Sequence, residues 1–259
     1  MLPELTNKSI QTLILLAETA GKEILKIYHT TFETRIKNDN SPVTIADDVA
    51  EKIILLGLSN FSPHLPVVSE EAYSKGHRPN ISKGIFWLVD ALDGTKEFIN
   101  KRDEFTVNIA LINDKKPVFG IVYAPALGIL YHGGEIGAFK RDAQGYEKKI
   151  YVRTPKKNGI TVVKSRSHRG NEDTIIKNYK INNTIYTGSS IKLCMIAEGS
   201  ADLYPRITPT SEWDIAAGHA ILIAAGGKLT QIDGTPFLYG KENIINPKFI
   251  ARGREPIRS

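Results

Sequence analysis

Four carboxylates from three well-separated segments are the residues of this chain whose types and spacing are best suited to chemistry. Glu70 follows one short apolar run, Asp90 and Asp93 flank the end of another, and Asp214 stands where a helical pattern begins. Carboxylate oxygens at this spacing suit Mg²⁺. Four acids brought together would repel one another unless cations neutralised them. The pattern therefore predicts a divalent-metal site, provided that the fold brings the three segments together.

The tripeptide Asp93-Gly94-Thr95 also has a simpler interpretation, because Asp-Gly is a turn dipeptide and Asp commonly caps helices. The chain offers its own comparison in the segment 233–236, which repeats the tripeptide, lacks an acid three residues earlier and continues with Pro. We interpret this second copy as a plain turn. The first copy differs because it comes with the other acids.

Apolar periodicity indicates the elements that must position these acids. Helical spacing predicts a helix over 10–27 and a second one over 47–58, whose acidic first turn suits the positive end of a helix dipole. Short apolar runs predict buried strands at 65–69 and 85–89, each followed at once by an acid. Turn residues separate further β-like runs that are typical of an antiparallel meander: 105–112, 118–123, 129–132 and 136–140.

From residue 147 the pattern changes to alternating strands and helices. The expected order is strand 160–163, helix 171–179, strand 185–187, helix 189–198, strand 201–204, helix 213–225 and strand 228–232. Because no Gly/Ser-rich or Pro-rich linker divides the chain, we expect one compact unit over 1–259. Its N-terminal half, 1–145, would be α+β and its C-terminal half, 146–259, would be α/β.

Composition narrows the class of protein. The 259 residues are 41% apolar and 24% charged, which is typical of a globular chain and not of a disordered one. A single cysteine, Cys194, forms no internal disulfide, so a reducing, cytoplasmic setting is expected. The longest apolar runs fall far short of the roughly 20 residues that cross a bilayer. The 34 basic and 28 acidic residues give a net charge of +6, compatible with nucleic acid, an anionic membrane surface or a phosphorylated small molecule.

The acids in their order along the chain resemble a known signature. Glu70, then Asp90-x-Leu92-Asp93-Gly94-Thr95, then Trp213-Asp214 is similar to that of the inositol monophosphatase-like superfamily of Mg²⁺-dependent, Li⁺-sensitive phosphatases. The resemblance covers residues 37–227 and implies a layered αβαβα sandwich. It also implies two or three Mg²⁺ ions in the site.

The resemblance assigns roles to individual residues. Glu70, Asp90, Asp93 and Asp214 would be metal ligands through their side chains, and Leu92 through its backbone carbonyl. Asp47 and Thr95 would position a water for attack on phosphorus, although Asp47 alone is equally suited to capping its helix. Backbone N–H groups around Gly94 and Thr95 would hold phosphate oxygens. Catalytic roles thus fall on three residues: Asp47, Glu70 and Thr95.

Within the superfamily, several segments resemble the 3′(2′),5′-bisphosphate nucleotidases: 96–99, 189–194, 197–206 and 209–214. This branch removes the 3′-phosphate from adenosine 3′,5′-bisphosphate to give AMP and is linked to sulfate assimilation; 3′-phosphoadenylyl sulfate is a second expected substrate. The predicted substrate-binding residues are Glu70, Leu92, Asp93, Gly94, Thr95, His168, Ser189, Lys192, Arg206 and Asp214.

The second phosphate of such a substrate needs cationic recognition of its own, and Lys192 and Arg206 are the candidates. Both could instead be solvated surface charges. Ser189 stands three residues before Lys192 and either shares its helix face or caps the helix. His168 matches a position beside the nucleotide, but a loop histidine is commonly just exposed.

Two alternative functions are weighed against this one. An inositol monophosphatase or sugar bisphosphatase would use the same acids on another alcohol phosphate. A non-catalytic RNA- or membrane-surface-binding protein would use the +6 charge. No basic run alternates with aromatic residues as a single-strand platform requires, so we expect no specific nucleic acid partner. The resemblance permits peripheral contact with the inner membrane, and the oligomeric state is left open.

Overall fold

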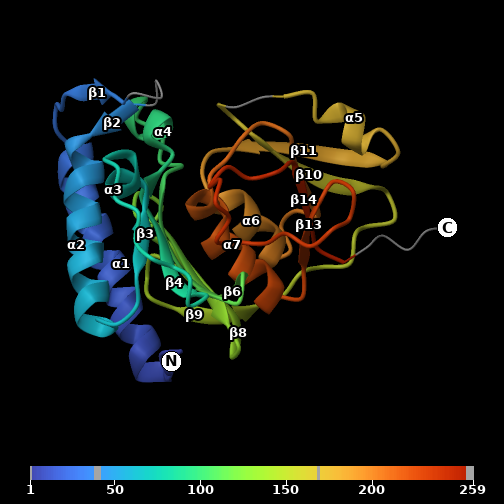
Figure 1. Ribbon diagram of the computed structural model, residues 1–259. Coiled ribbons are helices and arrows are strands. Elements are labelled where there is room, and N and C mark those ends of the chain that lie inside the picture. Colours follow the sequence, from blue (N-terminus) through green and yellow to red (C-terminus); the bar gives the residue numbers. More distant parts are fainter. Residues whose placement is uncertain (1, 38–41, 168–169, 255–259) are drawn as a thin grey trace.

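The computed structural model describes residues 2–37, 42–167 and 170–254. In this part of the chain the elements stack in five layers (Figure 1). Helices α1 (Asn7–Tyr28) and α2 (Ile45–Phe61) cover one face of a first sheet, and α6 (Ile191–Ala197) and α7 (Glu212–Ala224) lie between that sheet and a second. The short helix α5 (Asp173–Ile176) lies outside the second sheet. The predicted αβαβα sandwich is confirmed.

The first sheet has seven strands in sequence order. They are β3 (Val67–Ser69), β4 (Ile85–Asp93), β5 (Thr106–Asn113), β6 (Lys116–Ala124), β7 (Ile129–Gly134), β8 (Gly137–Arg141) and β9 (Glu147–Ile150). β3 runs parallel to β4 and every later pair is antiparallel, which confirms the predicted meander. The strand β9 was not expected, and it extends this sheet past residue 145, where the first half was predicted to end.

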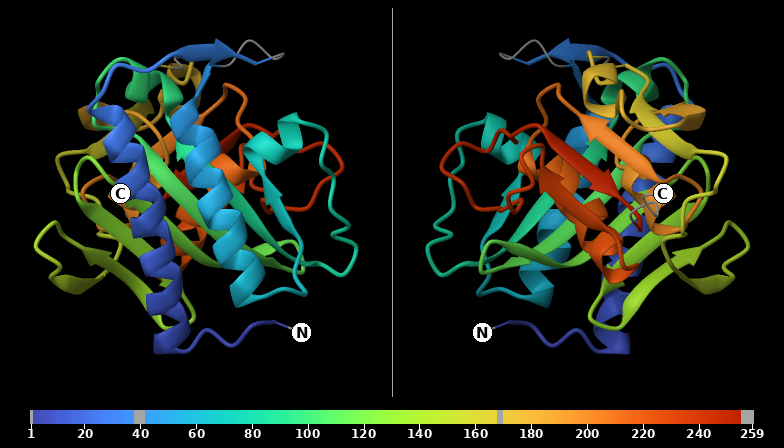
Figure 2. Two further views of the ribbon diagram at one scale, coloured as in Figure 1. Left: turned by 90° about the vertical axis from the view of Figure 1, so that its left-hand side faces the viewer. Right: turned by 90° about the vertical axis from the view of Figure 1, so that its right-hand side faces the viewer.

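Strict alternation along the strands decides which helices each face covers. On β5, Val107, Ile109 and Leu111 pack with α1 and α2 in one hydrophobic cluster. Ala110 and Ile112 belong to a different cluster, on the side of α6 and α7. A strand buried on both faces is a continuous apolar run, which explains why sequence periodicity found β5 without indicating its two faces. Figure 2 shows α1 and α2 side by side across the outer face.

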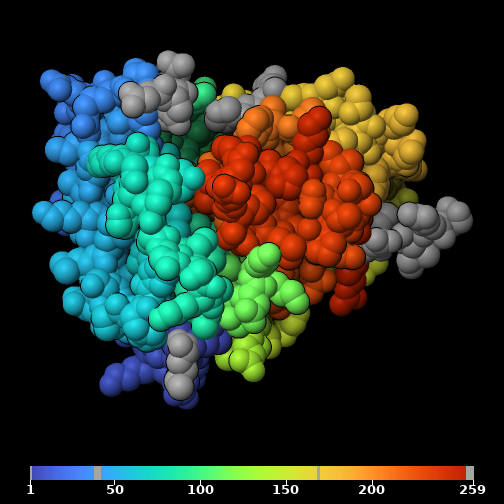
Figure 3. Space-filling model, in the orientation of Figure 1, coloured from blue at the N-terminus to red at the C-terminus, as the bar shows by residue number. Residues whose placement is uncertain are grey.

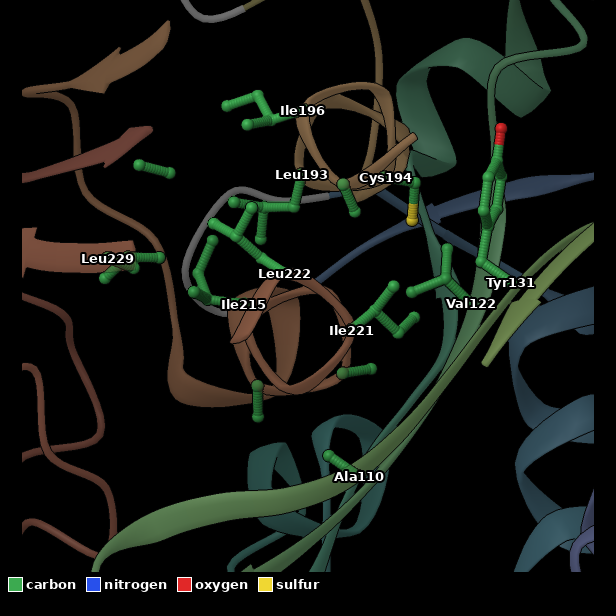
Figure 4. Close-up of a cluster of buried hydrophobic side chains, with 14 of the residues drawn as sticks. Ala110, Val122, Tyr131, Leu193, Cys194, Ile196, Ile215, Ile221, Leu222 and Leu229 are labelled. Atoms are coloured by element: carbon green, nitrogen blue, oxygen red, sulfur yellow. The ribbon is translucent and has the colours of Figure 1, made fainter. Parts of the chain in front are cut away.

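Helix α7 lies unusually close to the first sheet. A Cβ atom at Gly120 on β6 would come within 2.3 Å of the backbone oxygen of Ala217, so only glycine leaves room for the helix there. In Figure 4, Ile221 of α7 points toward Val122 of the first sheet, while Leu229 of the second sheet lies on the other side of the helix. The helix therefore buries apolar side chains on both of these sides, as expected of a layer between two sheets.

The second sheet is mixed. Its order is β11 (Ile181–Thr187), β10 (Ile160–Ser165), β12 (Leu203–Arg206), β14 (Phe249–Arg252) and β13 (Lys228–Gln231), with β10 parallel to both neighbours and β14 antiparallel to both of its own. In Figure 3, segments from the C-terminal part of the chain (red) pack directly against segments from its N-terminal part (blue to green). The division into two halves nonetheless stays a prediction.

Several short elements differ from the expectation. The helix predicted over 171–179 is wrong in length, since α5 keeps only four residues and buries Ile176 alone, too little apolar contact to stabilise more turns. The sequence did not predict β1 (Thr34–Ile36), β2 (Pro42–Thr44), α3 (Glu70–Ser74) or β14, because these short runs show no clear periodicity. Helix α4 (Thr95–Ile99) follows Gly94 directly. In the described residues, no helix has the length and hydropathy needed to cross a bilayer.

Candidate active site

Alternation along β4 aims its acid at the layer of α6 and α7. Phe86 and Leu88 belong to the cluster on that side, so Asp90, two residues further on, points the same way. The ladder to β5 is interrupted between Asp90 and Asp93 by a bulge, after which Asp93 pairs with Thr106. Bulges re-aim side chains, and here one turns both acids toward one cavity. The strand predicted over 85–89 is thus longer than expected and includes the bulge.

Two helix starts complete the acidic group. Glu70 is the first residue of α3, directly after β3, and Asp214 is in the first turn of α7. Asp214 also accepts the backbone N–H of Ser211 at 2.8 Å, which closes a capping box. One carboxylate oxygen from each of Glu70, Asp90 and Asp214 lies within 4.8 Å of the others. The fold therefore brings the three separate segments together, as the sequence predicts.

Asp93 and Leu92 lie on the same cavity wall, outside this trio. The carboxylate of Asp93 accepts a 2.8 Å hydrogen bond from Ser190 Oγ. The side chain of Leu92 is buried on the α1 and α2 side, and its carbonyl oxygen lies 3.3 Å from Thr95 Oγ1. Asp93 thus extends the acidic surface away from the trio toward α6.

The electrostatics of the group favour cations. Burial raises the pKa of Asp90 and of Asp214 well above the ordinary aspartate value, and the neighbouring carboxylates raise both further. The pKa of Glu70 and of Asp93 is raised as well, again chiefly by burial. Crowded, buried carboxylates are stable in their charged form only beside positive charge. The donor set consists of hard oxygens, so these residues fit a divalent ion of the Mg²⁺ type.

Asp47 and Thr95 form the predicted pair. Thr95 Oγ1 lies 3.2 Å from Asp47 Oδ1, across two elements far apart in sequence. The other oxygen of Asp47 accepts both the backbone N–H and the hydroxyl of Thr44, each at 2.8 Å. Asp47 therefore caps its helix with one oxygen and contacts Thr95 with the other, and its role in positioning a water stays a prediction. Burial raises the pKa of its carboxyl, against the effect of these hydrogen bonds.

Lys37 was not among the predicted site residues, although it contacts one of them. Its ammonium donates to Glu70 at 2.6 Å and to Glu71 at 2.5 Å. Burial alone would lower the pKa of Lys37, but the two glutamates outweigh it and the pKa is raised. Glu51 of α2 accepts the backbone N–H of Glu71 at 2.9 Å and so anchors the start of α3. A lone lysine in a polar segment gives no sequence signal for this role.

The cavity also has a cationic wall. Lys192 and Arg206 are both buried, and both line the cavity that the acids line. Lys192 donates to the carbonyls of Ser189 at 2.5 Å and Thr187 at 3.4 Å, and Arg206 to those of Thr208 and Pro209. Neither forms a salt bridge with a carboxylate of the described residues. The interpretation of the two as solvated surface charges is therefore wrong.

Burial, opposed by the nearby Asp93 and reinforced by Arg206, lowers the pKa of Lys192 to about 8. Two buried cations that repel each other in this way are stabilised by a shared anion. The cavity thus holds an acidic wall, suited to metals, and a cationic wall, suited to a second anionic group.

Ser189 lies neither on the helix face of Lys192 nor at the N-cap, so both sequence-based interpretations are wrong. Helix α6 begins at Ile191 with Ser190 as its N-cap, and Ser189 has φ 46° in the left-handed region. Its buried hydroxyl lines the cavity and has no hydrogen-bond partner among the described residues. Gly94, with φ 94°, also lines the cavity. His168 lies outside the described residues.

Ser190 and Asn108 were missed by sequence reasoning. The hydroxyl of Ser190 lies 2.8 Å from Asp93 Oδ2, 2.7 Å from the backbone oxygen of Asp214 and 2.8 Å from the amide nitrogen of Asn108. It therefore connects α6 to β4, β5 and α7 at one point. The only available signal was the pair of serines before a helical run, which resembles an ordinary helix start.

Comparison with known proteins agrees with this geometry. The family model described as "Inositol monophosphatase family" matches residues 6–255. The chain belongs to the inositol monophosphatase family. Its members are metal-dependent phosphatases, in keeping with the carboxylate group described above.

Relatives within this family are close. The chain is 44% identical over 239 residues to the 3′(2′),5′-bisphosphate nucleotidase CysQ of Salmonella typhimurium, covering 90% of this chain and 95% of that one. It is 41% identical over 255 residues to the protein of the same name from Buchnera aphidicola, covering 95% and 94%. A crystal structure of CysQ from Bacteroides thetaiotaomicron matches with a TM-score of 0.82 and 36% identity, over 97% of this chain and 99% of that chain.

Proposed function

We propose that the protein is a Mg²⁺-dependent phosphatase that removes the 3′-phosphate of adenosine 3′,5′-bisphosphate to give AMP and phosphate. The observation that supports this best is the pairing of two walls in one cavity. Glu70, Asp90 and Asp214 form the acidic wall, and Lys192 and Arg206 form the buried cationic wall. A substrate with two phosphates has one group for each wall. The high identity to proteins named as 3′(2′),5′-bisphosphate nucleotidases supports the same substrate class.

In this proposal Glu70, Asp90, Asp93, Asp214 and the carbonyl of Leu92 hold two or three Mg²⁺ ions. Bound there, the ions supply charge neutralisation for the phosphate and activation of water. Hydrolysis of a phosphate monoester needs such neutralisation more than it needs a covalent nucleophile, so no Ser, Cys or His attack is required.

The chain's own groups orient the attacking water. Thr95 Oγ1 donates a hydrogen bond to Asp47, so its lone pairs are left to accept a hydrogen bond from water in the cavity. Asp47 is itself held by Thr44, which limits its movement. Glu70 is the second proposed acceptor for the water, and Lys37 holds its carboxylate in place. Backbone N–H groups around Gly94 are proposed to hold phosphate oxygens.

The cationic wall distinguishes this proposal from its alternatives. An inositol monophosphate has one phosphate, which would leave Lys192 and Arg206 buried without an anion. Two buried cations also give no surface for an RNA or a membrane, because both side chains are inside the cavity. We extend the proposal to 3′-phosphoadenylyl sulfate, whose 5′ end is also anionic. Inhibition by Li⁺ and a role beside sulfate assimilation are proposed from the resemblance alone, and cytoplasmic residence is proposed from the single cysteine, Cys194.

Phosphate release tests the reaction. Adenosine 3′,5′-bisphosphate and inositol 1-phosphate are compared at low concentration, each with Mg²⁺ and with EDTA. We expect release from the bisphosphate to exceed release from inositol 1-phosphate by at least about tenfold and to stop in EDTA. Faster release from inositol 1-phosphate would favour the first alternative. Salt-sensitive RNA binding without any release would favour the second.

Lys192→Ala tests the distal phosphate. We expect the KM for adenosine 3′,5′-bisphosphate to rise about tenfold or more, while the KM for adenosine 3′-phosphate changes little, because only the first substrate has a 5′-phosphate to lose its partner. Lys148→Ala, an exposed lysine on β9, is the matched control. Equal effects of Lys192→Ala on both substrates would contradict the role.

A further inference from the structure

A glutamate from the N-terminal half contacts the turn that leads to Lys192. Glu104, in the loop before β5, accepts two hydrogen bonds from the guanidinium of Arg166, at 2.8 Å to Oε2 and 2.6 Å to Oε1. The same Oε2 accepts the backbone N–H of Gly188 at 2.9 Å. Burial alone would raise the pKa of Glu104, but Arg166 and Gly188 lower it below the ordinary value. The carboxylate of Glu104 is thus charged, and it is fixed in place by Arg166 and by the backbone of Gly188.

Arg166 extends this contact to the ends of two strands. It follows β10 directly, and its guanidinium also donates to the carbonyl of Tyr186 at 2.6 Å. Its backbone N–H donates to the carbonyl of Thr187 at 3.1 Å, where β11 ends. One planar, bidentate ion pair therefore joins the loop before β5 to the ends of β10 and β11.

The turn over 187–190 is pressed against the same region. A Cβ atom at Gly188 would lie 2.7 Å from the backbone oxygen of Glu104 and 2.7 Å from Cγ of Glu97. Ser189 takes a left-handed conformation, and its carbonyl accepts the ammonium of Lys192 at 2.5 Å. The place of that ammonium in the cavity thus depends on where this turn lies.

We propose that Glu104 is a positioning residue for substrate specificity. Its ion pair with Arg166 and its bond to Gly188 hold the 187–190 turn, and through that turn they hold the Lys192 ammonium where the distal phosphate binds. This inference rests on the proposed function and adds to it a residue that does not itself contact the substrate.

The chain contains a second ion pair of the same design, which serves as the control. Arg153 donates to both oxygens of Asp202 at 2.8 and 2.7 Å, and Asp202 accepts the backbone N–H of Thr161 at 2.7 Å. None of these three residues lines the cavity, whereas Gly188 does. Glu104 and Asp202 thus each bind one arginine and one backbone N–H. They differ because only the backbone N–H that Glu104 binds belongs to a residue lining the cavity.

The experiment compares Glu104→Gln with Asp202→Asn in the full chain. Glutamine keeps an oxygen for the Gly188 N–H and loses the charge that holds Arg166. We expect Glu104→Gln to raise the KM for adenosine 3′,5′-bisphosphate about tenfold with little change in kcat, and to leave the KM for adenosine 3′-phosphate within about twofold. Asp202→Asn should lower the unfolding midpoint without changing either KM.

Arg166→Lys provides the second route, since it keeps a charge and loses the bidentate fork. It should raise the same KM, and the double variant should show less than the sum of the two effects, because both changes break one unit. If Glu104→Gln does not fold, the KM values of Arg166→Lys alone test the proposal.

Three outcomes would overturn the proposal: a folded Glu104→Gln variant with parental KM for the bisphosphate, an equal rise for both substrates, or fully additive effects. If the parent protein releases no phosphate, the proposed function fails on its own. Calorimetric binding of adenosine 3′,5′-bisphosphate then decides the inference, and equal affinities of parent and Glu104→Gln, or no binding at all, would overturn it.

Discussion

Two copies of one tripeptide in this chain have different partners. In the exposed copy, Asp233 Oδ1 accepts the N–H and the hydroxyl of Thr235 at 2.9 and 2.7 Å, a closed local turn. In the other, Thr95 contacts Asp47, 48 residues away, and Asp93 contacts Ser190, 97 residues away. The interpretation of 233–236 as a plain turn is confirmed. At the residue scale, the chemistry of Asp-Gly-Thr is thus decided by long-range partners.

Asp93→Asn tests the acidic wall. We expect phosphate release to fall by at least about 100-fold, because a neutral amide is a weaker ligand for Mg²⁺ than a carboxylate. Mg²⁺ should also raise the thermal unfolding midpoint of the parent protein more than that of the variant, since ligand binding stabilises the folded state. Circular dichroism checks that the fold is kept. Parental activity in this variant would refute the proposed metal site.

Ser190→Ala tests the hydroxyl that joins Asp93 to the backbone of Asp214. We expect Mg²⁺ affinity, measured by thermal shift, to fall about tenfold, because Asp93 loses a hydrogen bond that orients it. Stability should also fall by about 1 to 2 kcal/mol, since the buried amide of Asn108 loses one of its hydrogen bonds. Ser189→Ala is the control, because the hydroxyl of Ser189 has no hydrogen bond to any of the proposed metal-ligating residues. Equal Mg²⁺ affinities in the two variants would argue against this role.

At the scale of elements, the site depends on how closely α7 approaches the first sheet. Asp214 is in the first turn of that helix, and Asp90 is in strand β4 of the first sheet. Gly120 sets the separation, because a side chain there would meet the backbone of Ala217. The hydrogen-bonded start of α7 and the bulge of β4 then aim the acids at one another.

Gly120→Ala tests this close approach. We expect the free energy of unfolding to fall by about 3 kcal/mol, because the new methyl group meets backbone atoms that cannot move aside as a side chain can. Urea unfolding measures the change, and Lys116→Ala on the exposed end of the same strand is the control. An unchanged free energy of unfolding would mean that α7 can shift to make room for the methyl group, which would contradict the prediction.

At the scale of the whole molecule, the α6 and α7 layer is buried between two sheets and contains titratable groups far from the cavity. His219 on α7 is buried, its Nδ1 lies 2.9 Å from the hydroxyl of Tyr239, and Phe237 packs beside it. Burial lowers the pKa of His219 to about 3 from its ordinary 6.5. The folded protein therefore keeps this imidazole neutral.

The pH dependence of stability follows from this shift. The unfolded chain binds a proton at His219 below pH 6.5, while the folded chain binds it only near pH 3. The contribution of His219 to the free energy of unfolding should therefore fall as the pH falls through this window, by about 2 kcal/mol between pH 6.5 and 5. His219→Gln should remove that component, and urea unfolding at both pH values measures the difference. Parallel pH profiles for the two proteins would contradict the prediction.

Sequence periodicity predicted the long elements, and the resemblance to the inositol monophosphatase-like superfamily implied the layered architecture. Helices α1, α2 and α7 and the meander β4–β8 are long enough for their apolar spacing to be read residue by residue. The acidic residues were predicted from their types and from a resemblance that kept their order. Several short elements, among them β1, β2 and α3, were missed because so few residues show no period, and α5 was predicted too long.

What the sequence by itself determined is the set of carboxylates and the elements before each of them, because side-chain chemistry and local periodicity are properties of neighbouring residues. Only the tertiary structure decided which groups meet. It showed that Lys37 binds Glu70 and that Ser190 joins two acids. It also showed that Lys192 and Arg206 are buried together. These contacts join residues far apart in the chain, and their geometry depends on how closely the layers pack.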